Sequence, residues 1–339
     1  MKTERKKATI VDLARKSGVS IATASRVINS RENVADATRE RVLKVAKRIG
    51  FMPQHTTRRV TLGLVVNEIQ KIHEVAYVGS VICALINHAA QCDVVLEILS
   101  VSDLERIYSH YFQGLIGLVF GKAVAPLRKV TKIPVLLINN RSEKGGFSTI
   151  AADHLQGARI GTEYLLKNGH ERIALVQIEA GDWGAGERET GYRQAYAQAG
   201  VPVPEDLIAY LEGRSVEEGF DPVLRKNPTA VFVGGEDLSL AVANALIHRL
   251  KVKMPDELSL LTYETPITSY LCSPSLSTVA QPWDQLARQA IDAILSAIRM
   301  NSREPQHVLL PNELIIRQSV QDRSSSAGGQ CDGILRGQP

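Results

Sequence analysis

Residues 14–29 read ARKSGVSIATASRVIN, and this stretch decides how the N-terminal part of the chain folds. Gly18 interrupts the helical pattern before it, and glycine adopts the left-handed backbone of a tight turn without steric cost. Ser20 is a favourable N-cap for a new helix, because its hydroxyl can accept a hydrogen bond from an N–H of the first turn. The stretch therefore predicts two short helices joined by a tight turn.

Apolar residues at helical spacing extend this pattern and add a third helix. The spacing predicts helices over about residues 9–16, 21–29 and 36–49, with Gly50 ending the third. The inward-facing positions are Ile10, Leu13 and Ala14 in the first helix, Ala24, Val27 and Ile28 in the second, and Val42, Leu43, Val45, Ala46 and Ile49 in the third. The second helix leaves five side chains outside: Ile21, Ala22, Thr23, Ser25 and Arg26.

Charge is divided unevenly along the 339 residues. Residues 1–60 contain 15 Lys and Arg against 5 Asp and Glu, whereas the remainder contains 25 against 31. A small basic head on a mildly acidic body is typical of a protein that binds a polyanion through one domain. A solvated basic tail would give the same imbalance, so charge alone leaves both interpretations open.

After residue 60 the hydrophobic period changes. Short apolar runs, of the kind that form strands buried on both faces, alternate with helical patterns. The runs are residues 62–66, 94–99, 115–120, 134–138, 173–177, 230–233, 258–261 and 276–279. The helical patterns are residues 78–91, 154–168, 187–199, 216–226, 237–250 and 283–300. This alternation predicts an α/β core with parallel strands and helices on both faces, in one large sheet or two smaller ones.

Several features expected of other protein classes are missing. No apolar stretch approaches the roughly 20 residues that a membrane span needs, so we expect no membrane partner. The basic start leads into an amphipathic helix and not an apolar one, which argues for a cytoplasmic protein. No G-x-G-x-x-G motif or P-loop follows the first strand, so we expect no enzyme and no cofactor. The four cysteines are far apart, which predicts incidental thiols and no metal site: Cys83, Cys92, Cys272 and Cys331.

The N-terminal stretch resembles the helix-turn-helix of the LacI/GalR family of bacterial regulators. It matches the family pattern A-x-x-x-G-V-S-x-x-T-x-S-R-V-x-N from Ala14 to Asn29. Residues 38–42 and the run Gly50-Phe51-x-Pro53 are similar to the family's third helix and its exit. The resemblance implies a DNA-binding headpiece over residues 1–52, whose second helix enters the major groove of double-stranded operator DNA.

Within that helix, Arg26 is best suited to read a base, since its guanidinium can pair bidentately with guanine O6 and N7. Ile21 and Ala22 match the positions that set specificity in the family, but here they can offer only contacts with thymine methyl groups or with groove shape. We expect four polar residues to bond phosphates: Ser20, Thr23, Ser25 and Asn29. The alternative is that Thr23 and Ser25 are simply exposed helix residues.

The linker over residues 53–61 departs from the family. Members usually continue P-N-x-x-A-R-x-L and form a hinge helix whose leucine wedges into the minor groove. This chain keeps Pro53 and Arg58, places Val60 at the leucine position and leads directly into a strand. Because Thr56 and Thr57 are indifferent helix formers, we expect a weaker bend or a differently built linker, with Val60 as the candidate wedge.

The resemblance continues more loosely to about Gln318. It implies a periplasmic-binding-protein-like core over residues 62–320, with two Rossmann-like lobes and a small molecule between them, and a disordered tail follows at 321–339. The motifs that carry it are Leu165-x-x-x-Gly169-His170-x-Arg172-Ile173-Ala174, Arg188-x-x-Gly191-Tyr192, Asp256-Glu257-Leu258-Ser259-Leu260, Pro274-x-Leu276-Ser277-Thr278-Val279-x-Gln281-Pro282 and Leu310-Pro311-x-Glu313-Leu314-Ile315-Ile316-Arg317.

Ligands of such sheets bind beyond the carboxyl ends of the strands. The candidate effector residues are Asp153, Arg188, Glu236, Asp237, Glu264, Trp283 and, from a less similar segment, Tyr77. Arg188 matches the position from which the family clamps effector hydroxyls or a carboxylate, and an ion pair with Glu187 or Glu189 is the alternative. Glu236, Asp237 and Glu264 would suit a ligand rich in hydroxyl donors, or a cationic one. The alternative is that they begin helices after their strands. Trp183 and Trp283 favour a saccharide, whose faces stack on aromatic rings, although interior packing would also explain them.

These features predict a homodimeric transcription regulator, a repressor, that binds operator DNA and is controlled by a small molecule, in our interpretation a sugar. Two other interpretations stay open. The same DNA-binding regulator would be controlled by a protein co-regulator, or the chain would be a sugar-binding module without DNA binding.

Overall fold

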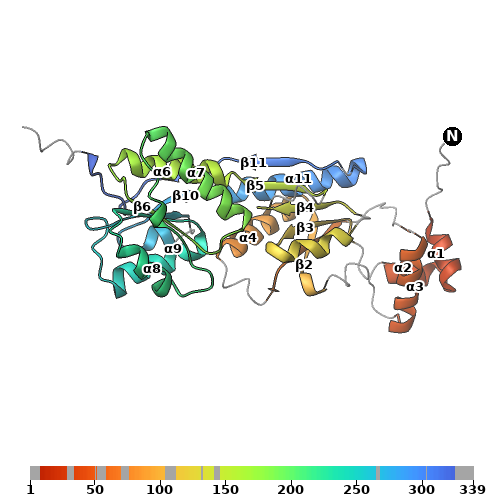
Figure 1. Cartoon of the computed structure of the whole chain (residues 1–339). Helices are drawn as coiled ribbons and strands as arrows, with labels where there is room; N and C mark the ends of the chain where they lie inside the picture. The colour runs from red at the N-terminus through yellow and green to blue at the C-terminus, as the bar shows by residue number, and fades with distance from the viewer. Residues whose placement is uncertain are drawn as a thin grey trace, which may run out of the picture. The chain divides into compact units, whose positions relative to one another are not determined.

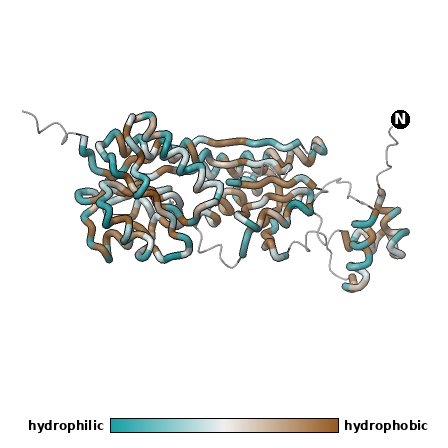
Figure 2. The backbone as a smooth tube through the Cα atoms, viewed as in Figure 1, coloured by the Kyte–Doolittle hydropathy of each residue, from teal (hydrophilic) through white to brown (hydrophobic). Residues whose placement is uncertain are grey.

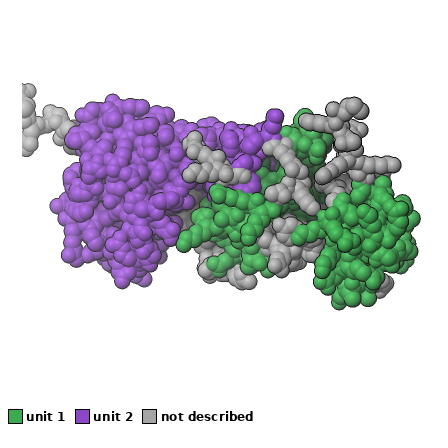
Figure 3. Space-filling view, turned by 45° about the vertical axis from the view of Figure 1, so that its right-hand side comes forward, with its two compact units in different colours: residues 1–69, 86–136, 291–303 green, residues 70–85, 137–290, 304–339 purple. Residues whose placement is uncertain are grey.

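A computed structural model of the chain describes residues 8–28, 34–49, 51, 59–69, 76–103, 112–130, 133–140, 146–264, 268–302 and 304–324 (Figure 1). The chain divides into two compact units, which Figure 3 colours separately. Unit 1 comprises residues 1–69, 86–136 and 291–303, and unit 2 comprises residues 70–85, 137–290 and 304–339. Among the described residues, no helix is long and apolar enough to cross a membrane.

The headpiece has three helices: α1 (Ile10–Ser17), α2 (Ile21–Ile28) and α3 (Asp36–Ile49). Gly18 ends α1 with φ 67°, and its N–H donates to the carbonyls of Ala14 and Arg15. Ser20 then caps α2, since its Oγ accepts from the N–H of Thr23 over 3.0 Å. The inward faces meet in one small core whose buried members are Leu13, Ala14, Ala24, Val27, Ile28, Val42, Val45, Ala46 and Phe51. The predicted helices, turn and cap are confirmed.

The first sheet has six strands in the order β11-β5-β4-β3-β1-β2. These strands are β1 (Val60–Val66), β2 (Val94–Ser100), β3 (Gly114–Leu118), β4 (Val135–Ile138), β5 (Ser148–Ala152) and β11 (His307–Leu310). Helix α4 (Ala76–Gln91) joins β1 to β2, and two 3-10 helices lie at Val101–Asp103 and Gly121–Lys129. On β3, a Cβ at Gly114 would lie 2.9 Å from Ile294 Cγ1, so glycine lets this side chain of α11 (Trp283–Met300) approach the strand.

The second sheet also has six strands, in the order β12-β10-β9-β8-β6-β7. Its strands are β6 (Ile173–Gln177), β7 (Ile208–Tyr210), β8 (Ala230–Val233), β9 (Ser259–Tyr263), β10 (Ser277–Ala280) and β12 (Glu313–Ile315). The helices of this part are α6 (His154–Lys167), α7 (Trp183–Ala199), α8 (Val216–Leu224), α9 (Glu236–Asn244) with a π-helical continuation at Ala245–Arg249, and α10 (Thr268–Leu271), and a 3-10 turn lies at Glu205–Leu207. Neighbouring strands of this sheet pair in parallel, except that β10 and β12 are antiparallel.

Alternation along these strands builds a core on each face of the second sheet. Ile173 and Leu175 of β6 pack with Leu165 of α6 and with α7, whereas Ala174 and Val176 pack with α8 and α9. Figure 1 shows these two helix pairs on opposite faces, and Figure 2 shows hydrophobic stretches recurring along the central strands. Burial on both faces explains the continuous apolar runs of the sequence.

The chain passes between the sheets three times, by way of α6, of α11 and of the short step from β11 to β12. The structure therefore answers the question that the spacing left open: there are two smaller sheets and not one large one. This two-sheet arrangement with crossing connections agrees with the periplasmic-binding-protein-like core that the resemblance implied.

Two predicted boundaries were wrong. Strand β1 begins at Val60, which lies opposite Val94 in the parallel register, so Val60 belongs to the sheet and not to a hinge helix. The wedge assignment to Val60 is therefore withdrawn. At the other end, Gln321 donates its N–H to Ser259 Oγ over 2.9 Å and Arg323 donates to Asn168 O over 2.9 Å. These residues pack on the core, and the rest of the expected tail, residues 325–339, lies outside the described chain.

Candidate functional site

Helix α2 presents the residues that the sequence nominated for DNA contact. Ile21, Ala22 and Arg26 are exposed, and the side chain of Ile21 is a large apolar group left 52% accessible. Thr23 and Ser25 are half-buried, and Asn29 lies outside the described residues. An exposed isoleucine at the start of the helix serves no core, which fits a contact with thymine methyl groups or groove walls.

The start of α2 is fixed by side-chain hydrogen bonds. Ser20 Oγ lies 2.8 Å from Thr23 Oγ1 and also accepts from the Thr23 N–H. Thr9 does the same for α1 in a reciprocal capping box with Asp12, and this hydrogen bond holds the pKa of Asp12 below its usual value. The first turn of each helix is therefore pre-organised. The hydroxyl of Ser20 is engaged in the cap, so its predicted phosphate contact would share that oxygen.

A second candidate site lies in unit 2, at the carboxyl ends of β6 and β9. Arg188 of α7 donates from Nε to Oε1 of Gln177, the last residue of β6, over 2.9 Å. Its Cζ lies 5.5 Å from the ring centroid of Tyr263, within the range of a cation–π contact. Within the described chain neither neighbouring glutamate pairs with Arg188, because Glu189 pairs with Arg193 at 2.8 Å. In this structure Glu189 therefore serves Arg193, while the guanidinium of Arg188 is held by Gln177.

Gln177 is completely buried, and its neighbours fix its orientation. Its Nε2 donates to the carbonyl of Ala185 over 3.1 Å and to the hydroxyl of Tyr210 over 3.3 Å. Tyr210 in turn donates to Glu189. Burial and this contact with a carboxylate raise the pKa of Tyr210 to about 12, so the phenol stays protonated. The amide oxygen of Gln177 is therefore held toward Arg188.

His154 lies beside Arg188 at the start of α6 and is 5% exposed. Burial, and then the positive charge of Arg188, hold the pKa of its imidazole well below the usual 6.5, so the ring is neutral near pH 7. The ring meets Trp183 edge-on at a centroid distance of 5.3 Å and Tyr263 at 6.5 Å. A guanidinium, a neutral imidazole and two aromatic rings thus lie close together in unit 2.

Asp153 and Asn312 extend this cluster. Asp153 caps α6, since its Oδ1 accepts from the N–H of Gln156 over 2.9 Å. Asn312 Nδ2 donates to the carbonyl of Asp153 over 2.6 Å. A Cβ at Gly157 would lie 2.6 Å from Asn312 Nδ2 and 3.2 Å from the hydroxyl of Tyr263, so glycine makes room for both side chains. We call the residues Arg188, Gln177, His154, Trp183, Tyr263 and Asn312 the Arg188 cluster.

Three buried polar atoms of the Arg188 cluster have no hydrogen-bond partner within the described chain. They are Nδ1 of His154, Nε1 of Trp183 and Oδ1 of Asn312. A buried polar atom without a partner costs about 1–3 kcal/mol. Three such atoms in one cluster therefore mark a place where solvent or a bound molecule supplies the missing partners.

Trp283 and Tyr77, two more predicted residues, form their own pair. Their rings meet in a T-shaped contact with centroids 5.2 Å apart. Two residues before Trp283, Gln281 accepts from Asn139 Nδ2 over 2.7 Å, and Asn139 Oδ1 accepts from the N–H of Ala152 over 2.7 Å. Because Ala152 immediately precedes Asp153, this network ties the aromatic pair to the strand end beside the Arg188 cluster.

Glu264, which directly follows β9, is engaged within the protein. Both of its carboxylate oxygens are paired with Arg317, at 2.9 Å and 3.0 Å, and Thr278 donates to it as well. The side chains of Arg317 and Glu264 are only 16% and 12% exposed, so this is a largely buried salt bridge. These partners occupy acceptor positions of Glu264, and its predicted contact with an effector stays a prediction. The side chains of Glu236 and Asp237, at the start of α9, lie outside what the structure describes.

Sequence reasoning missed His154, Gln177, Tyr263 and Asn312. Gln177 and Tyr263 end strands β6 and β9, and His154 follows Asp153 after β5. The rule that ligands bind beyond the carboxyl ends of strands would have identified Gln177, Tyr263 and His154 as candidates. Asn312 had no such signal, because it lies between two short strands.

Two family profiles match this chain. Residues 9–54 match the bacterial regulatory proteins of the lacI family, and residues 162–320 match a periplasmic binding protein-like domain. The chain belongs to the LacI family. Its predicted family and fold are thereby confirmed, and it is a transcription regulator of this family.

Relatives of similar length support this assignment. The chain is 28% identical over 338 residues to the transcriptional regulator DegA of Bacillus subtilis, which covers 93% of this chain and 98% of DegA. It is 26% identical over 336 residues to the repressor PurR of Vibrio parahaemolyticus, with 92% and 98% covered.

Solved structures agree on the fold. The transcriptional regulator CelR in its complex with cellobiose aligns with a TM-score of 0.70 at 23% identity, covering 92% of this chain and all of that one. The lac repressor dimer bound to operator and an anti-inducer aligns with a TM-score of 0.66 at 21% identity, covering 93% and 100%.

Proposed function

We propose that this LacI-family regulator is a repressor that reads operator DNA through α2 and is controlled by a saccharide bound at the Arg188 cluster. The observation that carries the effector part is the group of buried polar atoms without partners beside a fixed guanidinium. These atoms include a donor, Trp183 Nε1, and an acceptor, Asn312 Oδ1, while His154 Nδ1 takes either role according to its tautomer.

A saccharide matches this set of groups. Each sugar hydroxyl donates one hydrogen bond and accepts others, so it can satisfy a donor and an acceptor together. The ring of Trp183 offers an apolar surface beside these groups, and binding pockets of small molecules usually combine such surfaces with a few fixed polar groups. That CelR was solved with cellobiose is in line with this class of ligand.

The DNA part of the proposal is supported by the exposed side of α2. Arg26 stands out of the headpiece core with its guanidinium in solvent, one helical turn after the apolar, exposed Ile21 and Ala22. A homodimer would carry two such helices, and two half-sites one turn of DNA apart lie about 34–36 Å from centre to centre. The lac repressor of the same fold was solved as a dimer on its operator.

The DNA part is tested with the full chain and a selected operator. Arg26→Ala should lose sequence preference by about 1–3 kcal/mol per half-site while it keeps salt-sensitive, nonspecific binding. The matched control is Arg41→Ala on the exposed side of α3, which should weaken binding to all sequences alike. If Arg26→Ala still selected the wild-type operator over a scrambled one, the recognition helix would be misassigned.

The effector part is tested by calorimetry of the full chain against a panel of mono- and disaccharides. A positive sugar should also change operator affinity, and the change should be lost in Trp183→Phe, which keeps the ring and removes the N–H donor. Silence across the panel, together with operator binding that changes only when a protein from the same cells is added, would favour the protein co-regulator instead.

A further inference from the structure

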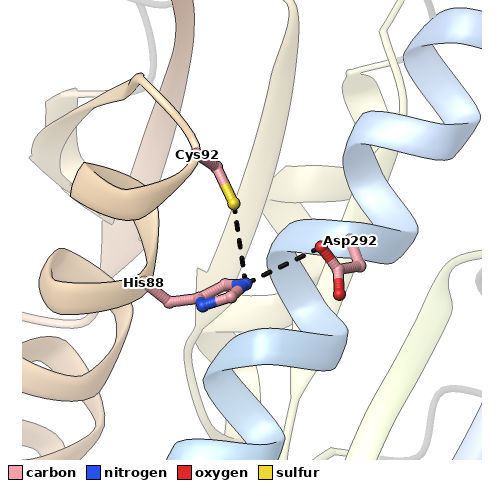
Figure 4. Close-up of side chains that lie close together, drawn as sticks. All are labelled: His88, Cys92 and Asp292. Carbon is pink, nitrogen blue, oxygen red and sulfur yellow. Dashed lines mark hydrogen bonds and ion pairs between the residues drawn. The ribbon is translucent and has the colours of Figure 1, made fainter.

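Three side chains of unit 1 with metal-binding atoms meet outside the two sites described above. His88 and Cys92 stand four residues apart at the end of α4, and Asp292 lies on α11 (Figure 4). The N–H of Cys92 donates to the carbonyl of His88 over 3.1 Å, so the last helical turn sets the spacing of the two side chains. We propose that His88, Cys92 and Asp292 form a Zn²⁺ site that joins the end of α4 to α11.

The distances between the donor atoms suit one tetrahedral ion. Cys92 Sγ lies 3.6 Å from His88 Nε2, and Asp292 Oδ1 lies 3.7 Å from the same nitrogen. All three atoms lie within 4.8 Å of one another. Zinc bonds of about 2.0–2.3 Å at tetrahedral angles place pairs of N, O and S ligands about 3.3–3.7 Å apart. Small side-chain rotations therefore suffice to close the three atoms around an ion.

The same geometry argues against a nucleophilic relay. In a Cys–His–Asp relay the thiol and the carboxylate contact opposite nitrogens of the imidazole. Here both groups approach Nε2, as Figure 4 shows, while Nδ1 points away from them. Three donor atoms that converge on one point, and do not form a chain, are the arrangement that a metal ion requires.

The donor set selects the kind of ion. A thiolate and an imidazole disfavour Mg²⁺ and Ca²⁺, which bind oxygen ligands, and together with one carboxylate they suit Zn²⁺. Three protein ligands leave the fourth position of a tetrahedral ion for water or a solution ligand. The Asp292 side chain is 61% exposed and His88 is 17% exposed, so an ion can enter from solvent.

The test uses the full-length protein after chelator treatment. Titration with Co²⁺ should give one tightly bound ion per chain and a near-ultraviolet band from thiolate-to-cobalt charge transfer, and Zn²⁺ should displace it. Cys92→Ser should abolish the band, and Asp292→Asn should weaken Zn²⁺ binding by at least about tenfold. Matched controls lie on the same helices: the exposed Cys83→Ser on α4 and the exposed Asp284→Asn on α11 should behave like the wild type.

Thermal unfolding gives an independent readout, because an ion that binds only the folded chain raises its Tm. Zn²⁺ should raise the Tm of the wild type and of both control variants but not of Cys92→Ser or His88→Ala. The proposal is overturned if the wild type gives no charge-transfer band, or if the band and the Zn²⁺-dependent shift persist in Cys92→Ser.

Discussion

Arg188 and Gln177 are joined by a hydrogen bond of 2.9 Å from the guanidinium Nε to the amide Oε1. The donor is Nε of Arg188, so neither terminal nitrogen of the guanidinium takes part in this bond. A Cβ at Gly184 would lie 3.3 Å from one of them, so the glycine of the same helix leaves space for the guanidinium. The buried Gln177 thus acts as a positioning residue for the charged group of the proposed effector site.

Replacing Arg188 by lysine should lower the affinity of the protein for its effector. Lysine keeps the charge but cannot donate to Gln177 and to a ligand from one rigid, planar group. Loss of one charge-assisted hydrogen bond, about 1.5–3 kcal/mol, corresponds to an affinity about 10- to 150-fold lower. Calorimetry with the sugar selected from the panel measures this change. Arg225→Lys at the end of α8 should leave the affinity within about twofold, because Arg225 is exposed and pairs with Asp221 on its own helix.

Replacing Gly191 by alanine should destabilise unit 2. A Cβ at this position would lie 2.1 Å from the carbonyl oxygen of Leu155, so α7 and α6 would have to separate. Backbone cannot move aside as a flexible side chain can, and a loss of about 1–3 kcal/mol or more is expected from the overpacking. Gly186→Ala on the same helix meets no atom within 4 Å and should stabilise by up to about 1 kcal/mol. Urea unfolding of both variants measures the contrast, and equal effects would contradict the close helix packing.

Because Glu264 and Arg317 form a salt bridge, the effects of substituting them on folding free energy should not be additive. Removing one partner in Arg317→Met leaves a largely buried carboxylate and should cost about 3–5 kcal/mol of folding free energy. The double variant Glu264→Leu/Arg317→Met should cost clearly less than the single one, because no charge is left unpaired. Chemical denaturation of the single and double variants gives the coupling energy. A simple sum of the single effects would mean that the two groups do not interact.

Because His154 is buried, the folding stability of the protein should fall in acid. Its imidazole has a pKa near 6.5 when unfolded and well below that value when folded. Below pH 6.5 the unfolded chain therefore binds a proton that the folded chain does not, so stability falls as the pH falls, by up to about 1.4 kcal/mol per unit. His154→Phe should lose less stability than the wild type between pH 7.5 and 5.5.

The control for this prediction is His248→Asn, since His248 is exposed. Its acid slope should equal that of the wild type. Burial also lowers the pKa of His170, which contributes in the same direction and leaves some slope in His154→Phe. Identical slopes for His154→Phe and the wild type would show that His154 does not titrate as its burial implies.

Local signals explain why the headpiece could be predicted nearly residue by residue. Gly18, Ser20 and the apolar spacing all act within a few residues, and each predicted helix agrees with the structure to within about one residue at its described ends. Most central strands could also be predicted from the sequence, because burial on both faces leaves a continuous apolar run. Strands β5, β7, β11 and β12 were missed. The last three are edge strands of three or four residues, only partly covered, so they lack an apolar run. β5 is an inner strand, but it begins with Ser148 and Thr149 and continues with only three apolar residues.

The start of α7 was misplaced despite a local cap, whereas the Arg188 cluster depends on tertiary contacts. The helix begins at Trp183, four residues before the predicted start, although Gly184 and Gly186 disfavour helix. Asp182 caps it by accepting from the N–H of Ala185 over 3.3 Å. The pairing of Glu264 with Arg317, 53 residues further along the chain, likewise left no local pattern to read.

The early start of β1 limits how loosely the headpiece is attached. Arg59, which pairs with Asp93 at 2.5 Å, immediately precedes the strand, and Phe51 is the last residue packed in the headpiece core. The eight peptide units between them can span at most about 29 Å even when fully stretched. Any movement of the first residue of β1 therefore has to leave the end of the headpiece core within that distance.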